Sequence, residues 1–165
     1  MAVINNAFET KGTNLYFVDT VTASADAVRK LTCPTGITGI NAGTKDRIDT
    51  TCLDETGGSR TYIGGFSDAG EVTVPFVVYK SDISHKALFS LKKSGDIVGW
   101  MVGLSDSTTA PTLGSGGTLV RPPARTTLSF NGYVSGVTID AAINEVIRGT
   151  LTIQASGDAT IAWGT

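Results

Sequence analysis

The chain has 165 residues, a length typical of one domain, and a formal net charge of −2 from 13 Lys and Arg against 15 Asp and Glu. This balance argues against a basic nucleic-acid reader, because such domains gain affinity by neutralising phosphates. Only 17 % of the residues are charged and 41 % are hydrophobic, a composition too apolar for a disordered chain. Frequent threonines, with 20 Gly and 5 Pro at turns, favour a mainly β protein.

The chain carries no pattern typical of a membrane protein or a secreted protein. No run reaches the roughly 18 apolar residues of a membrane span, and the first residues lack the basic and apolar regions of a signal peptide. We therefore expect no membrane partner and folding in a cytoplasm. There Cys33 and Cys52, which lack Cys-x-x-Cys spacing, are expected to be reduced, buried and inert thiols.

The first third of the chain predicts an arm followed by short strands. Residues 1–12 are weakly patterned and are expected to form an N-terminal arm that requires a partner to become ordered. Residues 14–20 predict a strand. Residues 22–31 fit either a helical turn or an extended segment, and residues 47–53 alternate as a half-buried strand does.

The next part predicts a hairpin and a strand. A strand restarts at Arg60, and the pair Gly64 and Gly65 permits a bend or a bulge in it. Residues 71–79 alternate and predict a strand. Pro75 within it has no N–H to donate, so this strand is expected at a sheet edge or at a bulge.

One α-helix is predicted at about residues 81–94. Ser81 is a suitable N-cap and Asp82 follows in the first turn, where a negative charge is favourable. Its apolar side chains recur at helical spacing on one face: Ile83, Ala87, Leu88 and Leu91. Lys92, Lys93 and Gly95 are typical of a helix end, and the helix is expected to cover one face of a sheet.

The second half predicts further strands around one long loop. Residues 106–125 form a Gly-, Pro- and Thr-rich loop, a length that is usually functional or ordered by a partner. Residues 140–148 fit a helical turn or an extended segment, and a turn is expected at 156–158. Strands are predicted at 96–104, 126–138, 150–154 and 159–163.

Residues typical of catalysis are scarce. His85 is the single histidine, expected to be partly exposed on the helix, and no nucleophile elbow, dinucleotide-binding glycine motif or P-loop occurs. Gly114–Gly117 precedes no helix and is interpreted as a flexible loop rather than an anion site. The pairs Asp54–Glu55 and Asp68–Glu71 are interpreted as solvated loop charges. We predict no enzyme, no metal site and no cofactor.

The order of several short motifs is more informative than any one of them. These segments are residues 47–51 (RIDTT), 62–76 (YIGGFSDAGEVTVPF), the helix, 99–102 (GWMV), 129–135 (SFNGYVS) and 151–157 (LTIQASG). This order, over roughly residues 40–157, resembles that of the major tail tube proteins of long-tailed, siphovirus-type bacteriophages.

The resemblance implies a β-sandwich or barrel-like tail tube fold with one flanking helix, in a single domain spanning residues 1–165. It implies hexameric rings that stack into a tail tube, with strands of each subunit lining a lumen. The implied partners are further copies of the chain, the tape measure protein, the tail terminator and the distal tail or baseplate proteins. Double-stranded DNA passes through without specific binding. The implied location is the virion tail, after assembly in the bacterial cytoplasm.

Within that framework the residues suggest two surfaces. Tyr62 and Phe66 offer apolar anchors beside Gly64 and Gly65, so we expect inter-subunit contacts there. A lumen that conducts DNA should repel phosphate, and we expect three carboxylates to contribute to it: Glu71, Asp140 and Glu145.

An alternative is another self-assembling β-sandwich protein, namely a secretion-system tube subunit, a capsid decoration protein or an adhesin, because fold alone does not choose among them. An enzyme with an unrecognised site is the third class, for which His85 would be the base.

Overall fold

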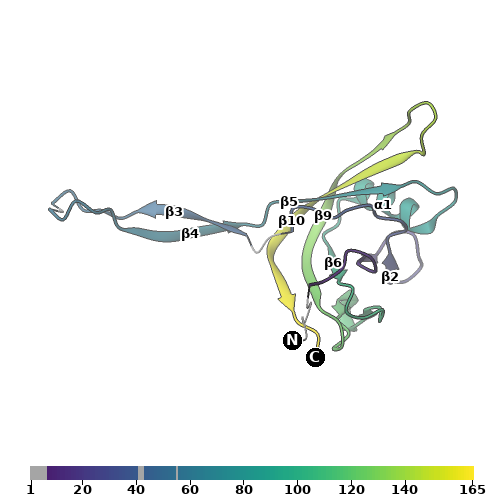
Figure 1. Cartoon of the computed structure of the whole chain (residues 1–165), viewed down its shortest axis with the longest axis horizontal. Coiled ribbons are helices and arrows are strands. Elements are labelled where there is room, and N and C mark those ends of the chain that lie inside the picture. Colours follow the sequence, from purple (N-terminus) through teal and green to yellow (C-terminus); the bar gives the residue numbers. More distant parts are fainter. Residues whose placement is uncertain (1–6, 41–42, 55) are drawn as a thin grey trace, which may run out of the picture.

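The computed structural model describes residues 7–40, 43–54 and 56–165. Within them the chain is mostly β with one α-helix, α1 (Ile83–Ser94), as the sequence predicts (Figure 1). The longer strands are β1 (Asn14–Asp19), β2 (Ala27–Lys30), β3 (Thr44–Asp49), β4 (Tyr62–Asp68), β5 (Glu71–Val77), β6 (Val98–Gly103), β9 (Thr127–Asp140) and β10 (Arg148–Ala162). Within the predicted long loop lie β7 (Thr112–Leu113), the 3₁₀ turn η1 (Ser115–Gly117) and β8 (Leu119–Val120).

Six strands form the main sheet in the order β2-β1-β6-β9-β10-β5, and all neighbouring pairs are antiparallel. The sheet ends at β2 and β5 and does not close into a barrel. The extended alternative for residues 22–31 is right for β2. Two further pairs, β3-β4 and β7-β8, form separate hairpins.

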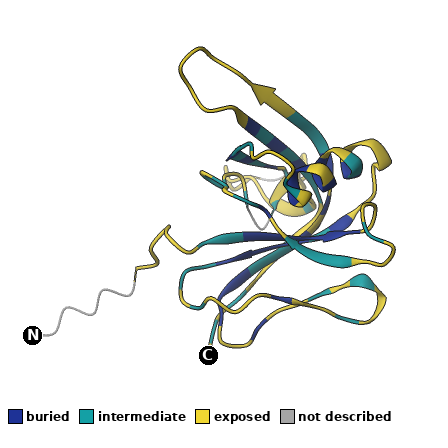
Figure 2. Ribbon diagram, turned by 90° about the vertical axis from the view of Figure 1, so that its right-hand side faces the viewer, coloured by how far each residue is buried: buried dark blue, intermediate teal, exposed yellow. Residues whose placement is uncertain are grey.

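The apolar core lies between one face of the main sheet and α1 (Figure 2). Phe17 stacks on Trp100 with ring centroids 5.2 Å apart, and the Trp100 indole N–H donates to the Gly132 carbonyl at 3.0 Å. The predicted helical stripe is confirmed for Ala87, Leu88 and Leu91, which are fully buried, whereas Ile83 is exposed.

The start of α1 differs from the prediction by one residue. Asp82, not Ser81, is the N-cap, because its Oδ1 accepts from the N–H groups of Ser84 and His85 at 2.8 and 3.2 Å. Burial tends to raise the pKa of Asp82, but bonds from Ser84, Thr32 and His85 outweigh it and lower that pKa. At the other end Gly95 adopts a left-handed conformation and closes the helix.

The prediction for Pro75 is confirmed, since β5 is an edge of the main sheet. Its neighbours Thr73 and Val77 donate outward to the carbonyls of Thr38 and Cys33 at 2.9 and 3.1 Å. A proline between them therefore removes no bond from the β5-β10 ladder.

Two hairpins project from this body (Figure 1). The β3-β4 hairpin extends sideways, and all six residues of β3 are exposed, so the half-buried strand expected at 47–53 is wrong in bounds and burial. Between Lys45 and Arg47 the register shifts against β4, which confirms the bulge expected at the Gly64–Gly65 bend.

The β9-β10 hairpin is formed by the two longest strands that the structure describes, and its tip lies at the opposite end of the body from the C-terminus (Figures 1 and 2). Residues 141–147 connect the strands, so neither a helix nor a continued strand occupies that segment. The turn expected at 156–158 is also wrong. Gly157, with φ of 84°, belongs to an irregularity inside β10, where extra residues bulge while the strand continues.

Candidate functional site

One face of β5, β10 and β9 is polar and points away from the core. Cross-strand partners share a face, and so do alternate residues along a strand. Glu71 pairs with Gln154, and Arg148 pairs with Asp140, so all four side chains lie on this face. Between these two ends the face presents mainly hydroxyl groups, from Thr73 on β5, Thr150 and Thr152 on β10, and Thr138 on β9.

The charges of this polar face stand at its ends, with Glu71 at one end and Asp140 opposite the cation Arg148 at the other. Glu71 and Asp140 are both exposed there, separated by about 20 Å along β10 at the usual rise per residue. Glu145 is exposed in the connection between β9 and β10, beyond the end of the sheet. The structure thus brings two of the three predicted carboxylates to one face and places the third at the tip of the hairpin.

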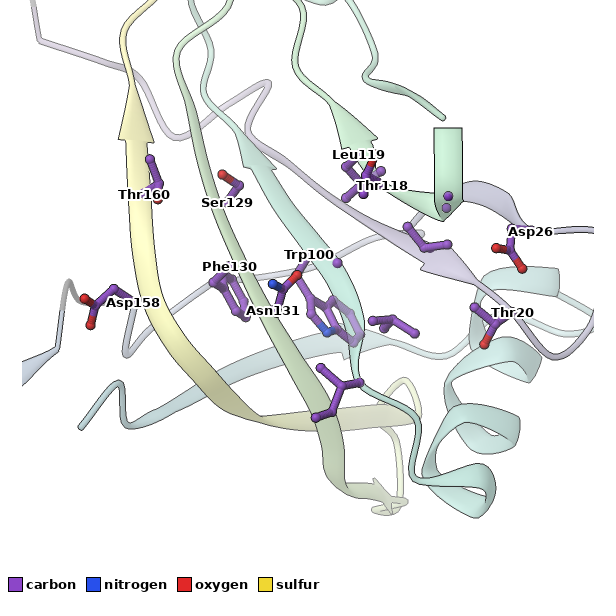
Figure 3. Close-up of a pocket in the computed structure, with 16 residues that line it drawn as sticks. Thr20, Asp26, Trp100, Thr118, Leu119, Ser129, Phe130, Asn131, Asp158 and Thr160 are labelled. Atoms are coloured by element: carbon purple, nitrogen blue, oxygen red, sulfur yellow. The ribbon is translucent and has the colours of Figure 1, made fainter. Parts of the chain in front are cut away.

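The polar face continues into a cleft of about 500 Å³ beside the β7-β8 hairpin. Thr118 and Leu119 form one wall, and Ser129 and Asn131 from β9 lie across from them (Figure 3). The ionisable side chains that line it are carboxylates, Asp26 and Asp158. None of the described residues that line the cleft is Lys or Arg, so the cleft offers no cation to hold a phosphate.

The β3-β4 hairpin has an apolar side and a polar side. Ile48 pairs with Ile63, and both are about half exposed, at 48 % and 56 %. Phe66 is 94 % exposed. On the polar side the Arg47 guanidinium stacks over the Tyr62 ring at 4.2 Å, which orients the tyrosine.

The glycine pair has a steric role in this hairpin. A Cβ at Gly65 would lie 3.3 Å from the Ile48 side chain and from the Asp46 backbone oxygen. Glycine therefore allows β3 and β4 to approach closely beside the bulge. The four predicted contact residues, Tyr62, Gly64, Gly65 and Phe66, all lie in β4 on the projecting hairpin.

Arg125, which the sequence patterns did not identify, lies at the end of the body where β9 begins. Its guanidinium donates six hydrogen bonds there. It is fully buried and donates to neutral oxygens only: the carbonyls of Gly12, Gly103, Leu104 and Thr109, the Asn14 amide and the Tyr16 hydroxyl, at 2.8–3.1 Å. A Cβ at Gly103 would lie 2.5 Å from the guanidinium, so that glycine makes room for it. The arginine thereby joins the arm, β1, β6 and the long loop.

Asp106 supports the same region. Its Oδ2 accepts from the Thr126 N–H at 2.7 Å. Desolvation tends to raise the pKa of Asp106, but the bonds from Thr126 and its own backbone N–H, with the nearby Arg125 charge, outweigh it and lower that pKa. An ionised Asp106 is thus held beside the buried guanidinium.

His85 and the cysteines differ from the predictions. His85 is buried, not partly exposed; its Nδ1 accepts from the Tyr79 N–H at 3.3 Å and its Nε2 lies 3.2 Å from the Thr32 carbonyl oxygen. Its ring also packs on Phe76, with centroids 4.8 Å apart. Both cysteines are exposed rather than buried. Cys33 lies 4.0 Å from the Tyr79 hydroxyl and raises the pKa of Tyr79.

In the parts of the chain that the structure describes, no three His, Cys, Asp or Glu side chains gather as a metal site would require. None of the helices in residues 7–40, 43–54 and 56–165 is long and apolar enough to cross a membrane.

The sequence matches a known protein family over nearly all of its length. The model of the family described as phage tail tube, TTP, lambda-like, matches residues 6–165. "Structural protein 3" of Pseudomonas phage PAJU2 is 37 % identical over 158 residues, which cover 93 % of each protein.

Solved structures share the fold at low sequence identity. The SPP1 tail tube superimposes with a TM-score of 0.61 at 10 % identity, covering 96 % of this chain and 82 % of that one. The tail of an empty gene transfer agent particle, refined with C6 symmetry, gives 0.62 at 14 % identity, covering 94 % and 99 %. A chain from the PVC contractile injection system, solved as a sheath/tube terminator, gives 0.66 at 13 %, covering 96 % and 99 %.

Proposed function

The chain belongs to the lambda-like phage tail tube family and is a structural protein of a phage tail tube, and from this premise we propose that it forms hexameric rings whose stacking builds the conduit for DNA ejection. The family match over residues 6–165 carries the proposal. Two projecting hairpins with exposed apolar side chains support it, because such surfaces favour association with further copies.

In this proposal the polar face of β5, β10 and β9 lines the lumen. Its centre presents threonine hydroxyls, and Glu71 and Asp140 stand at its two ends. The central hydroxyls give a moving duplex no fixed cation, and Glu71 repels its phosphates at one end. At the other end the exposed Arg148 lies opposite Asp140 and offsets its charge. Glu145, at the tip of the same hairpin, would add negative charge at the junction between rings.

We assign inter-subunit contacts to the β3-β4 hairpin. Phe66, together with Ile48 and Ile63, would pack on a neighbouring copy, while Tyr62 is held in place by Arg47. Aromatic side chains are enriched at the centres of such interfaces. The arm is proposed to contribute as well; residues 1–6 of it lie outside the described residues, and Phe8 stacks on Trp163 with centroids 6.5 Å apart.

The remaining partners follow from the place of a tube in a tail. We propose that the tube surrounds the tape measure protein, ends at a tail terminator and begins at distal tail or baseplate proteins. Assembly would take place in the bacterial cytoplasm, and the mature location would be the virion tail. The role is structural rather than enzymatic.

Electron microscopy of the concentrated, purified chain tests this function. We expect six-fold rings and hollow rods. A chain that stays monomeric at every concentration and salt tested, and also in the presence of a tail tip complex, would contradict the proposal.

A further inference from the structure

The β9-β10 hairpin continues the apolar face of the sheet beyond the end of the body (Figures 1 and 2). Ile139 lies on the core side of β9, because a Cβ added at its partner Gly149 would point into the buried Phe76 ring. We call residues 139–147 the overhang. Its apolar side chains are all substantially exposed: Ile139 50 %, Ile143 92 %, Val146 57 % and Ile147 46 %.

The opposite end of the body has a complementary groove on the same side of the sheet. This terminal groove, of about 580 Å³, lies between residues 8–13 at the end of the arm and just before β1, residues 34–40 and the adjoining ends of β6 and β9. Its apolar lining includes Ile37, Ile40, Leu104 and Leu128, which pack against the core from its margin. Apolar side chains at the margin of the core are therefore accessible at one end of the body, and the apolar side chains of the overhang project at the other end.

Both features involve β9. Leu128 near its start and Ile139 near its end point to the same side, because the bulge between Gly136 and Val134 keeps the core-facing residues in phase. A second copy displaced along β9 by the length of its 14 residues, on the order of 40 Å, would bring the overhang of one chain to the terminal groove of the other.

We propose that the overhang of each chain inserts into the terminal groove of a copy in the next ring, which is the axial contact of the tube. The inference rests on the proposed function and adds which surfaces meet between rings. Each copy donates one overhang and accepts another, so the contact is heterologous and remains open for further rings.

The small apolar area of the overhang favours contact with a copy that is itself part of a ring over contact with an independent partner protein. Four aliphatic side chains are too few to bury the roughly 800 Å² per partner of a stable pairwise interface. Contacts of this kind become effective when a ring offers several at once, since the later ones form at high effective concentration. Single chains would then associate weakly along the axis, whereas rings would stack.

Cysteine cross-linking tests this contact. In a Cys33→Ser, Cys52→Ser background, Ala142→Cys places a thiol on the overhang and Thr10→Cys places one on the groove rim, both at exposed positions. After oxidation of assembled tubes we expect a ladder of dimers, trimers and longer species, at least ten-fold above either single-cysteine variant. The matched control pairs Ala142→Cys with Lys93→Cys on α1 and is expected to give no ladder.

The outcomes separate the inference from the proposed function. Tubes that form without a ladder would overturn the axial contact and leave the tube function intact. Absence of tubes for the unaltered chain would contradict the function and, with it, this contact. A second variant, Ile143→Asp, should retain the unfolding midpoint and lose stacking at least ten-fold, whereas Ile97→Asp, at a 61 % exposed isoleucine in another part of the body, should stack normally. Normal stacking of Ile143→Asp would also overturn the contact.

Discussion

Arg125 donates a hydrogen bond of 3.0 Å to the carbonyl oxygen of Gly12, a residue 113 positions earlier in the chain. The same guanidinium bonds β1, β6 and Thr109 of the long loop. The arm and the long loop therefore leave the body from one bonded cluster. Because the terminal groove lies beside this cluster, the geometry of the groove depends on a side chain in no regular element.

Arg125→Met should destabilise the fold. The methionine fills much of the same space but leaves buried carbonyl oxygens without donors, each costing about 1–3 kcal/mol, so we expect a loss of at least about 3 kcal/mol in the free energy of unfolding. Urea unfolding followed by tryptophan fluorescence measures it. The matched control is Arg121→Met, an exposed arginine with one bond to the Trp163 carbonyl, which should change stability by less than about 0.5 kcal/mol. Equal effects would contradict the role of the cluster.

Acid should weaken the fold partly through Asp19, which is fully buried. Burial tends to raise the pKa of Asp19, but bonds from Thr22, Val21 and Arg29 outweigh it and lower that pKa. A lowered folded-state pKa gives stability that is present above the unfolded value of about 3.9 and is lost as pH falls through the folded value.

Asp19→Asn tests this dependence by unfolding in urea at pH 7, 5, 4 and 3. We expect the variant to be less stable at pH 7 and to lose less stability than the parent between pH 5 and 3. Asp54→Asn, at an exposed position in the loop after β3, should follow the parent. An Asp19→Asn curve parallel to that of the parent would show that Asp19 does not contribute to the acid response.

Phe66→Ala should reduce tube formation without changing stability. The ring is almost entirely exposed in the single chain, so its loss costs the fold little, whereas an assembled interface would lose a buried aromatic, worth about 2 kcal/mol or more at a central position. Sedimentation of tubes measures the effect, with Phe89→Ala on α1 as the control. If Phe66→Ala formed tubes at the same protein concentration as the parent, the assignment of inter-subunit contacts to the β3-β4 hairpin would be wrong.

Glu71→Lys, outside the overhang, should leave tube formation intact and slow DNA release. The substitution places a cation on the proposed lumen face of every copy, where it attracts phosphate. Ejection from particles is timed at low and moderate salt, and the delay should shrink as salt rises. Lys45→Glu combined with Arg60→Glu, on the β3-β4 hairpin outside the proposed lumen, controls for altered charge. Ejection that is normal at all salt concentrations would contradict the lumen assignment.

Local patterns predicted the elements whose stabilising interactions are close in sequence. The helix at 83–94 has its stripe and its glycine end within the segment, and Pro75 marks the edge strand through its missing N–H. The short motifs also predicted the family, which the match over residues 6–165 confirms.

Features that depend on distant partners were not predictable from the sequence. Arg125 follows two prolines in an aperiodic loop, and its acceptors come from three separate stretches of the chain, at residues 12–16, 103–104 and 109. Turn-forming residues at 156–158 indicated a break, but pairing with β9 carries β10 through them. Periodicity likewise predicted a half-buried strand at 47–53, but all six residues of β3 are exposed in the structure.

A cryo-electron microscopy reconstruction of tubes assembled from this chain shows directly which face lines the lumen. We expect a hexameric ring in which Thr73, Thr152 and Gln154 point toward the tube axis and the helix α1 lies on the outer side. A tube in which the polar face of β5, β10 and β9 points away from the axis would contradict the lumen assignment.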